Sequence, residues 1–193
     1  MITENASAQL GVGIRGGNPS GLTLKKYNGD NAIELSIGRN YWFNGSNWYN
    51  KHYDYWYDKH YLSNYDALNL DYVRAYTPFA VQLHFLKHKD FKSTGSADLS
   101  GLRYYYGGGL FFGYQRYVYS YYYKLNNDPN WYYMDRKDYA YINLGLDGVL
   151  GLEYTFEEVP VSIFLDGTLY LELINRPFLI AGFGGIGVRY NFE

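Results

Sequence analysis

The sequence predicts an all-β fold, an eight-stranded antiparallel up-and-down transmembrane β-barrel with two long extracellular loops. The first observation is that apolar residues alternate with polar residues or glycine at every second position through most of the chain, which is typical of strands. The second is that turn residues separate the alternating segments, as at 18–21 and 28–31. The third is that short and long connections follow one another in a regular order.

Length and composition limit the classes of protein that remain. A chain of 193 residues is expected to form one sizeable domain. Aromatic residues make up 21% of the chain, including 26 tyrosines, and tyrosine is both a strand former and an interface residue. The formal net charge of -2 provides no basic surplus, so we expect no nucleic-acid partner. The chain has no cysteine, which excludes disulfides and thiolate chemistry.

The first residues are expected to lie outside the folded domain. Ala6-Ser7-Ala8 is similar to the end of a secretory signal, although no apolar segment precedes it. We therefore interpret residues 1–8 as a signal-peptide remnant or as residues added for expression, and residues 9–193 as the barrel domain.

The alternating segments give the predicted strands. The clearest one, 141–156, places Leu144, Leu146 and Leu152 on one face and Asn143, Asp147 and Glu153 on the other. The same alternation predicts strands at about 9–17, 21–27, 32–42, 78–88, 102–117, 141–156, 161–173 and 180–192.

The lengths of the connections are asymmetric. Those at 28–31, 89–101 and 157–160 are short to medium, whereas the two longest are near 43–77 and 118–140. Antiparallel neighbours place both long connections at the same end of a barrel. Short periplasmic turns opposite long extracellular loops are typical of outer-membrane barrels.

Charged residues of both signs share the less apolar face of the predicted strands, and the opposite face is nearly free of charge. A soluble barrel points its polar face outward, whereas an outer-membrane barrel inverts this arrangement. Many glycines on the polar face favour a crowded interior, and aromatic residues near strand ends on the apolar face are typical of membrane-interface girdles. A soluble lectin-like or lipocalin-like barrel is the alternative. The predicted interior polar network consists of Glu34, Arg103, Asp147, Glu153, Asp166 and Arg189.

Three segments carry a resemblance to a known family. GLRYYYGGGLFFGY (101–114), DGVLGLEYTFEEVPVSIFLD (147–166) and GFGGIGVRYNF (182–192) are similar to the small OmpX-like outer-membrane β-barrels of Gram-negative bacteria, also described as porin-family proteins. The resemblance implies localisation in the cell outer membrane, among its lipid and lipopolysaccharide. It also implies recognition of the C-terminal strand by the barrel-assembly machinery through a final aromatic residue, here Phe192 followed by Glu193. It implies no agreed activity.

The sequence supports no catalytic, metal or cofactor site strongly. Of the four histidines, His52 and His60 alternate with Asp54 and Asp58, and this spacing would allow the four side chains to share a metal ion. A solvent-exposed loop face accounts for the same residues equally well. No nucleophile or zinc motif accompanies them, with only Ser46 and Ser63 as distant candidates. We therefore predict a non-enzyme without cofactor or metal. A lipid-modifying enzyme and a narrow channel are the alternatives, although side chains fill an eight-stranded barrel.

Aromatic residues concentrate in the two long connections, and all four tryptophans lie in them or at their edges. One interpretation is that the strands continue as a hairpin whose rings pack together. The other is a rigid recognition surface for surface glycans or other outer-membrane proteins. The predicted function is surface-exposed binding, adhesion or an accessory role in a larger outer-membrane complex. The predicted binding residues are Trp48, Tyr53, Tyr55, Trp56, Tyr57, Tyr121, Tyr123, Trp131 and Tyr133.

Overall fold

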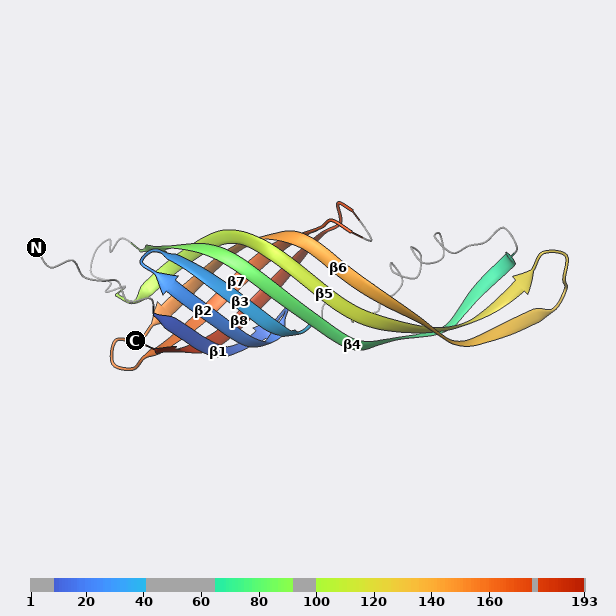
Figure 1. Ribbon diagram of the computed structural model, residues 1–193, viewed down its shortest axis with the longest axis horizontal. Helices are drawn as coiled ribbons and strands as arrows, with labels where there is room; N and C mark the ends of the chain where they lie inside the picture. Colours follow the sequence, from blue (N-terminus) through green and yellow to red (C-terminus); the bar gives the residue numbers. More distant parts are fainter. Residues whose placement is uncertain (1–8, 41–64, 92–99, 175–176, 193) are drawn as a thin grey trace, which may run out of the picture. The chain divides into compact units, whose positions relative to one another are not determined.

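The computed structural model describes residues 9–40, 65–91, 100–174 and 177–192, and these form a closed antiparallel barrel of eight strands in sequence order (Figure 1). No helix in these ranges is long and apolar enough to cross a membrane. The strands are β1 (Leu10–Gly17), β2 (Ser20–Asn28), β3 (Asn31–Arg39), β4 (Tyr65–Asp90), β5 (Leu102–Leu125), β6 (Trp131–Thr155), β7 (Val161–Glu172) and β8 (Ile180–Phe192).

The predicted fold class is confirmed, but three strands are longer than predicted. β4 begins at Tyr65 rather than near 78, β5 continues to Leu125, and β6 begins at Trp131. The loop predicted at 118–140 is therefore wrong, and the hairpin interpretation is correct for this segment. The reason is that tyrosines replace the aliphatic residues of the alternation there, and tyrosine forms strands as readily as they do.

The chain divides into two compact units, which are described separately. One unit contains residues 1–40, 79–113 and 142–193, and we call it the barrel. The other contains residues 41–78 and 114–141, and we call it the aromatic unit. Strands β4, β5 and β6 each contribute residues to both.

Aliphatic side chains face outward around the barrel. In the β7–β8 pair, Leu165 lies opposite Ile186 and the two side chains are 55% and 62% exposed. Aromatic rings flank this apolar surface, with ring centroids 5.0 Å apart for Tyr154 and Phe156 and 4.9 Å apart for Tyr190 and Phe192. The inverted arrangement of faces predicted from the alternation is therefore present. An apolar wall with aromatic rings at its edge matches the surface of a membrane barrel.

Glycines on the inner face make room for large interior side chains. A Cβ atom at Gly185 would meet the guanidinium of Arg15, and one at Gly187 would meet the ring of Phe164. These polar-face glycines therefore mark places where a bulky side chain crosses the interior, whereas a Cβ at Gly38 or Gly107 would meet the backbone of the neighbouring strand.

Gly185→Val should destabilise the barrel by about 1–3 kcal/mol, as expected for overpacking of a filled interior. The matched control is Gly182→Val on the same strand, because a Cβ there meets nothing within 4 Å. The measurement is the temperature at which the compact, fast-migrating form converts to the unfolded form on gels. Equal shifts for the two variants would contradict the assignment of the faces.

Candidate functional site

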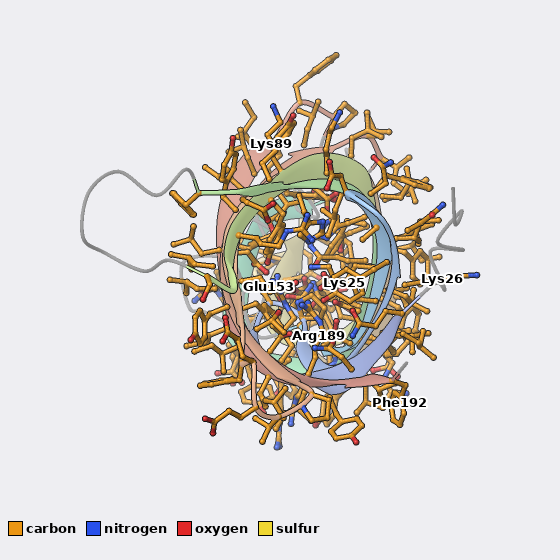
Figure 2. All side chains as sticks on the ribbon, turned by 90° about the vertical axis from the view of Figure 1, so that its left-hand side faces the viewer. Lys25, Lys26, Lys89, Glu153, Arg189 and Phe192 are labelled. Carbon is orange, nitrogen blue, oxygen red and sulfur yellow. The ribbon has the colours of Figure 1, made fainter. Side chains whose placement is uncertain are left out.

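The barrel interior holds a cluster of ionised side chains centred on Arg189. Its guanidinium donates to Glu34 Oε1 at 2.6 Å and to Glu153 Oε2 at 2.7 Å. Lys25 Nζ lies 2.8 Å from Glu153 Oε2 and 3.6 Å from Glu34 Oε2. The four side chains are between 0% and 3% exposed, and Figure 2 shows Lys25, Glu153 and Arg189 inside the ring of strands. Buried charges are costly unless they are paired, and these are.

Aromatic rings support the same cluster. Arg189 lies 3.6 Å from the centroid of the Phe164 ring, and Lys25 Nζ lies 4.2 Å from that of Tyr105. The Tyr27 hydroxyl donates to Glu153 Oε1 at 2.9 Å. Cation–π contacts strengthen when the cation is removed from water, as both cations are here.

Two smaller groups complete the polar interior. Arg15 donates two hydrogen bonds to Asp166, at 2.5 and 2.7 Å, and Tyr105 adds a third at 3.0 Å. Asp147 accepts from Gln82 Nε2 at 3.1 Å and lies 3.1 Å from His84 Nε2. The structure therefore brings Glu34, Glu153 and Arg189 into direct contact and places Asp147 and Asp166 in separate interior groups.

Arg103 does not join the predicted interior network. Its side chain is 25% exposed and pairs with Asp30 at 3.0 Å and Asp90 at 2.8 Å, whose side chains are 67% and 78% exposed. The prediction for Arg103 was wrong because alternation identifies the face of a residue but not its depth. β5 begins at Leu102, so Arg103 lies at the rim.

Sequence reasoning left several interior residues out of the predicted network. His88 lies between the rings of Tyr27 and Tyr105, with centroids 5.6 and 5.3 Å away, and His84 contacts Asp147. The sequence pattern could have identified these residues, since the alternation of 78–88 places positions 82, 84 and 88 on one face.

The interior has the character of a packed core. Beyond the ion pairs, Phe111, Tyr170 and Phe183 pack together, with centroid distances of 4.9 Å between Phe111 and Tyr170 and 5.6 Å between Tyr170 and Phe183. Among the described residues no group of three or more His, Asp or Glu is placed to hold a metal ion. The alternating strip at 52–60 lies outside the described residues.

The aromatic unit is built from ring pairs across β5 and β6. Tyr122 and Tyr133 have centroids 4.8 Å apart, and Tyr123 stacks with Tyr132 at 5.5 Å. Tyr117 is fully buried and contacts Tyr141 edge-on at 5.1 Å. Cross-strand pairs of this kind stabilise a two-stranded segment.

The predicted binding residues fall into three groups. Tyr121 is 6% exposed and packs 6.2 Å from Tyr123, which is half-buried, so both serve as packing residues. Trp131 and Tyr133 are 54% and 49% exposed. The others, Trp48, Tyr53, Tyr55, Trp56 and Tyr57, lie outside the described residues.

The turn between β5 and β6 is held by Asp128. Its carboxylate accepts from the Tyr132 hydroxyl at 2.6 Å and from the Asn130 backbone N–H at 2.9 Å, and Asn127 has a left-handed φ of 66°. The Tyr132 hydrogen bond, followed by that of Asn130, lowers the pKa of Asp128.

Asp128→Ala should increase amide hydrogen exchange at 126–132 without changing exchange in the barrel. A carboxyl with a depressed folded-state pKa stabilises the turn above its unfolded pKa of about 3.9, and this stabilisation is lost as the pH falls through the lower folded-state value. Amide exchange at 126–132 should therefore differ between wild type and Asp128→Ala at pH 7 but not at about pH 2. Equal exchange at pH 7 would show that the carboxylate does not hold the turn.

Comparison with known proteins supports the fold. No protein-family model matches the sequence, and no curated protein is significantly similar to it. Among solved structures, the N-terminal β-barrel domain of Pseudomonas aeruginosa OprF matches with a TM-score of 0.52 and 16% identity, over 97% of this chain and 98% of that one. At this identity the likeness shows an outer-membrane-type barrel fold and nothing finer, and membership of the OmpX-like group is not shown.

Proposed function

We propose that this chain is an integral protein of the cell outer membrane whose aromatic unit binds a partner outside the cell. Its role would be non-enzymatic: adhesion, or an accessory role in a larger outer-membrane assembly. The observation that carries the proposal is the combination of an apolar, membrane-type barrel wall with exposed aromatic side chains on the aromatic unit.

Orientation follows from the connections. The turns after β2, β4 and β6 lie at the end of the barrel that holds both termini of the described strands, and the connections after β3 and β5 lead to the other end. Strands β4, β5 and β6 have 26, 24 and 25 residues, far more than the roughly 9–11 that span a membrane, and outer-membrane barrels place their long excursions on the extracellular side. The connections of the aromatic unit are therefore assigned to the outside.

The interior disfavours a channel, because paired charges and packed rings fill the described part of the lumen. His84 and His88 contact Asp147, Tyr27 and Tyr105 inside the wall. His52 and His60, which the sequence offers for a lipid-modifying enzyme, lie outside the described residues.

Residence in the membrane is tested by cell fractionation. The protein should appear with outer membranes and migrate faster on gels without heating than after boiling. Recovery as a soluble monomer without detergent would exclude the proposed location.

The aromatic unit is suited to a neutral partner. Trp131 and Tyr133 offer exposed rings, and the described exposed charges of this unit are of both signs, including Asp71, Arg74 and Arg116. Such a surface does not steer a strongly charged ligand, whereas rigid rings stack well on sugars and on protein side chains. A glycan or an outer-membrane protein surface is therefore the expected partner.

Trp131→Ala combined with Tyr133→Ala should reduce binding to intact cells or glycan arrays by at least tenfold, since aromatic residues dominate such interfaces. Phe178→Ala is the matched control, because this ring is 84% exposed in the β7–β8 connection and belongs to the barrel. Both variants should keep heat-dependent migration. Undiminished binding by the double variant, or equal loss in the control, would exclude the aromatic unit as the binding surface.

Co-purification with a larger assembly in mild detergent separates the accessory role from adhesion.

A further inference from the structure

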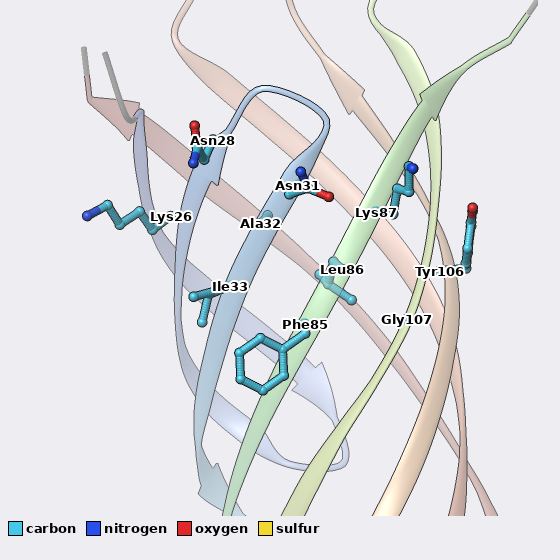
Figure 3. A pocket seen from close by; sticks show the side chains of 10 residues that line it. All are labelled: Lys26, Asn28, Asn31, Ala32, Ile33, Phe85, Leu86, Lys87, Tyr106 and Gly107. Carbon is cyan, nitrogen blue, oxygen red and sulfur yellow. The ribbon is translucent and has the colours of Figure 1, made fainter. Parts of the chain in front are cut away.

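The outer wall of the barrel carries a groove of about 600 Å³ over β2, β3, β4 and β5 (Figure 3). Ile33, Phe85 and Tyr106 form its apolar part, and Lys26 and Lys87 stand on opposite sides of it. We call it the lysine groove. It lies near the β2–β3 turn, which is the end of the barrel assigned to the periplasm.

Strand register explains how this surface is formed. Lys26 pairs with Ile33, which pairs with Phe85, and these three positions make one row across β2, β3 and β4. The next row toward the turn is formed by Asn28, Asn31 and Lys87. The two lysines therefore occupy opposite corners of the patch. Their Cα atoms are about 10 Å apart across the strands and about 7 Å apart along them, as expected from the strand spacing and the rise per residue. The side-chain amides of Asn28 and Asn31 lie in the row nearer the turn, and the apolar side chains of Ile33 and Phe85 lie in the row farther from it.

Both lysines are available to a ligand. Lys26 and Lys87 are exposed, and within the ranges that the structure describes neither forms an ion pair or a side-chain hydrogen bond. Two acidic residues, Asp30 and Asp90, lie close in sequence to lining residues of the groove, and Arg103 pairs with them at 3.0 and 2.8 Å. This single guanidinium balances one of their two negative charges, so together with the two exposed lysines the groove and these neighbours carry a net positive charge.

Among the described residues, the exposed lysines at this end of the barrel lie on β2 and β4, at positions 26, 87 and 89. β2, β4, β6 and β8 all end at this end of the barrel. The outward row of β6 ends in Tyr154 and Phe156 and that of β8 in Tyr190 and Phe192, whereas the outward rows of β2 and β4 turn polar at Lys26 and Lys87. Residues that only anchor a barrel at the membrane interface would be distributed around its whole circumference. Lysines on β2 and β4 alone instead indicate a local site.

We propose that the lysine groove binds an anionic phospholipid of the periplasmic leaflet, with a phosphodiester head group that lacks an ammonium, as in phosphatidylglycerol or cardiolipin. The phosphate would contact Lys26 and Lys87, the two asparagine amides would donate to head-group oxygens, and an acyl chain would lie against Ile33 and Phe85. Basic pockets at the membrane surface bind such head groups. A zwitterionic head group would place its ammonium near two lysines, and the repulsion between like charges disfavours it. The proposal rests on residence in the membrane.

The test uses the folded protein in a zwitterionic detergent, titrated with phosphatidylglycerol or phosphatidylethanolamine and observed by native mass spectrometry. Wild type should prefer phosphatidylglycerol by on the order of tenfold. Lys26→Gln with Lys87→Gln should abolish that preference. The matched control is Lys89→Gln with Lys124→Gln, which removes the same charge from lysines that do not line the groove and should retain the preference.

Three results would overturn the proposal: equal binding of both lipids by wild type, a preference that survives in the groove variant, or a preference lost equally in the control. Stronger binding of lipopolysaccharide that depends on Lys26 and Lys87 would overturn the assignment to the phospholipid leaflet. Heat-dependent migration of every variant shows that the barrel is folded. A protein that inserts in no membrane contradicts the proposed function itself and is distinguished by fractionation.

Discussion

Arg189→Met is expected to lower the free energy of unfolding by about 3–5 kcal/mol, because removing one member of a buried ion cluster leaves its partners uncompensated. Arg189 is fully buried and donates to both Glu34 and Glu153. After the substitution the ammonium of Lys25 is left to balance both carboxylates. Folded proteins are only marginally stable, so a loss of this size should move the urea midpoint of the variant well below that of wild type. Urea titration in detergent, followed by gel migration, measures the change.

The control for this prediction is Arg103→Met. Arg103 also holds two carboxylates, but they are largely exposed at the rim, so its loss should cost at most about 1 kcal/mol. Adding Glu34→Gln to Arg189→Met should recover part of the lost stability by removing one uncompensated charge. Equal stabilities of the Arg103 and Arg189 variants would show that burial of the cluster does not matter to the barrel.

Leu165→Arg should block insertion, with a cost of about 2–4 kcal/mol for a cation on the lipid face near the membrane midplane. Leu165 lies near the middle of β7, pairs with Leu152 and Ile186, and points outward. The measurement is the folded fraction after dilution from urea into phospholipid vesicles.

Val159→Arg is the matched control, since Val159 is a comparably exposed aliphatic residue in the β6–β7 turn rather than in a strand. It should insert like wild type. A soluble barrel would tolerate both substitutions, so normal folding of Leu165→Arg without lipid would contradict the membrane assignment and favour the soluble alternative.

The periodicity of the sequence was sufficient for the fold. Alternation shows which side chains share a face, and the polar-face glycines and the aromatic residues at strand ends favour the inverted arrangement. Together they place Asp147, Asp166 and Glu153 inside and Leu146 and Ile186 outside. The alternation does not predict how far from the rim a residue lies along its strand, or which side chain it contacts across the lumen. For this reason Arg103 was misplaced, and the pairing of Arg189 with Glu34 could not be derived.

The aromatic segments were harder to interpret. In a tyrosine-rich strand both faces carry the same residue type, so the sequence pattern does not distinguish buried Tyr121 from exposed Tyr133. Tyr121 is 6% exposed and lies beside Tyr123 of the same strand, whereas Tyr133 is 49% exposed and contacts Tyr122 across β5 and β6. The choice between packing and binding residues therefore required the structure.

The pairing of β1 with β8 has a consequence for how the chain folds. Leu10 lies opposite Phe192, so the seam joins the first strand to the last, and contacts of such large sequence separation form late and slowly. Arg189 in β8 also completes the charge cluster with Glu34 in β3. Until the final strand arrives, β1 retains an unpaired edge and the acids remain without their main counter-ion. The chain must therefore be kept from aggregating until synthesis is complete, and loss of β8 alone would leave an open, charged sheet that lipid does not accept.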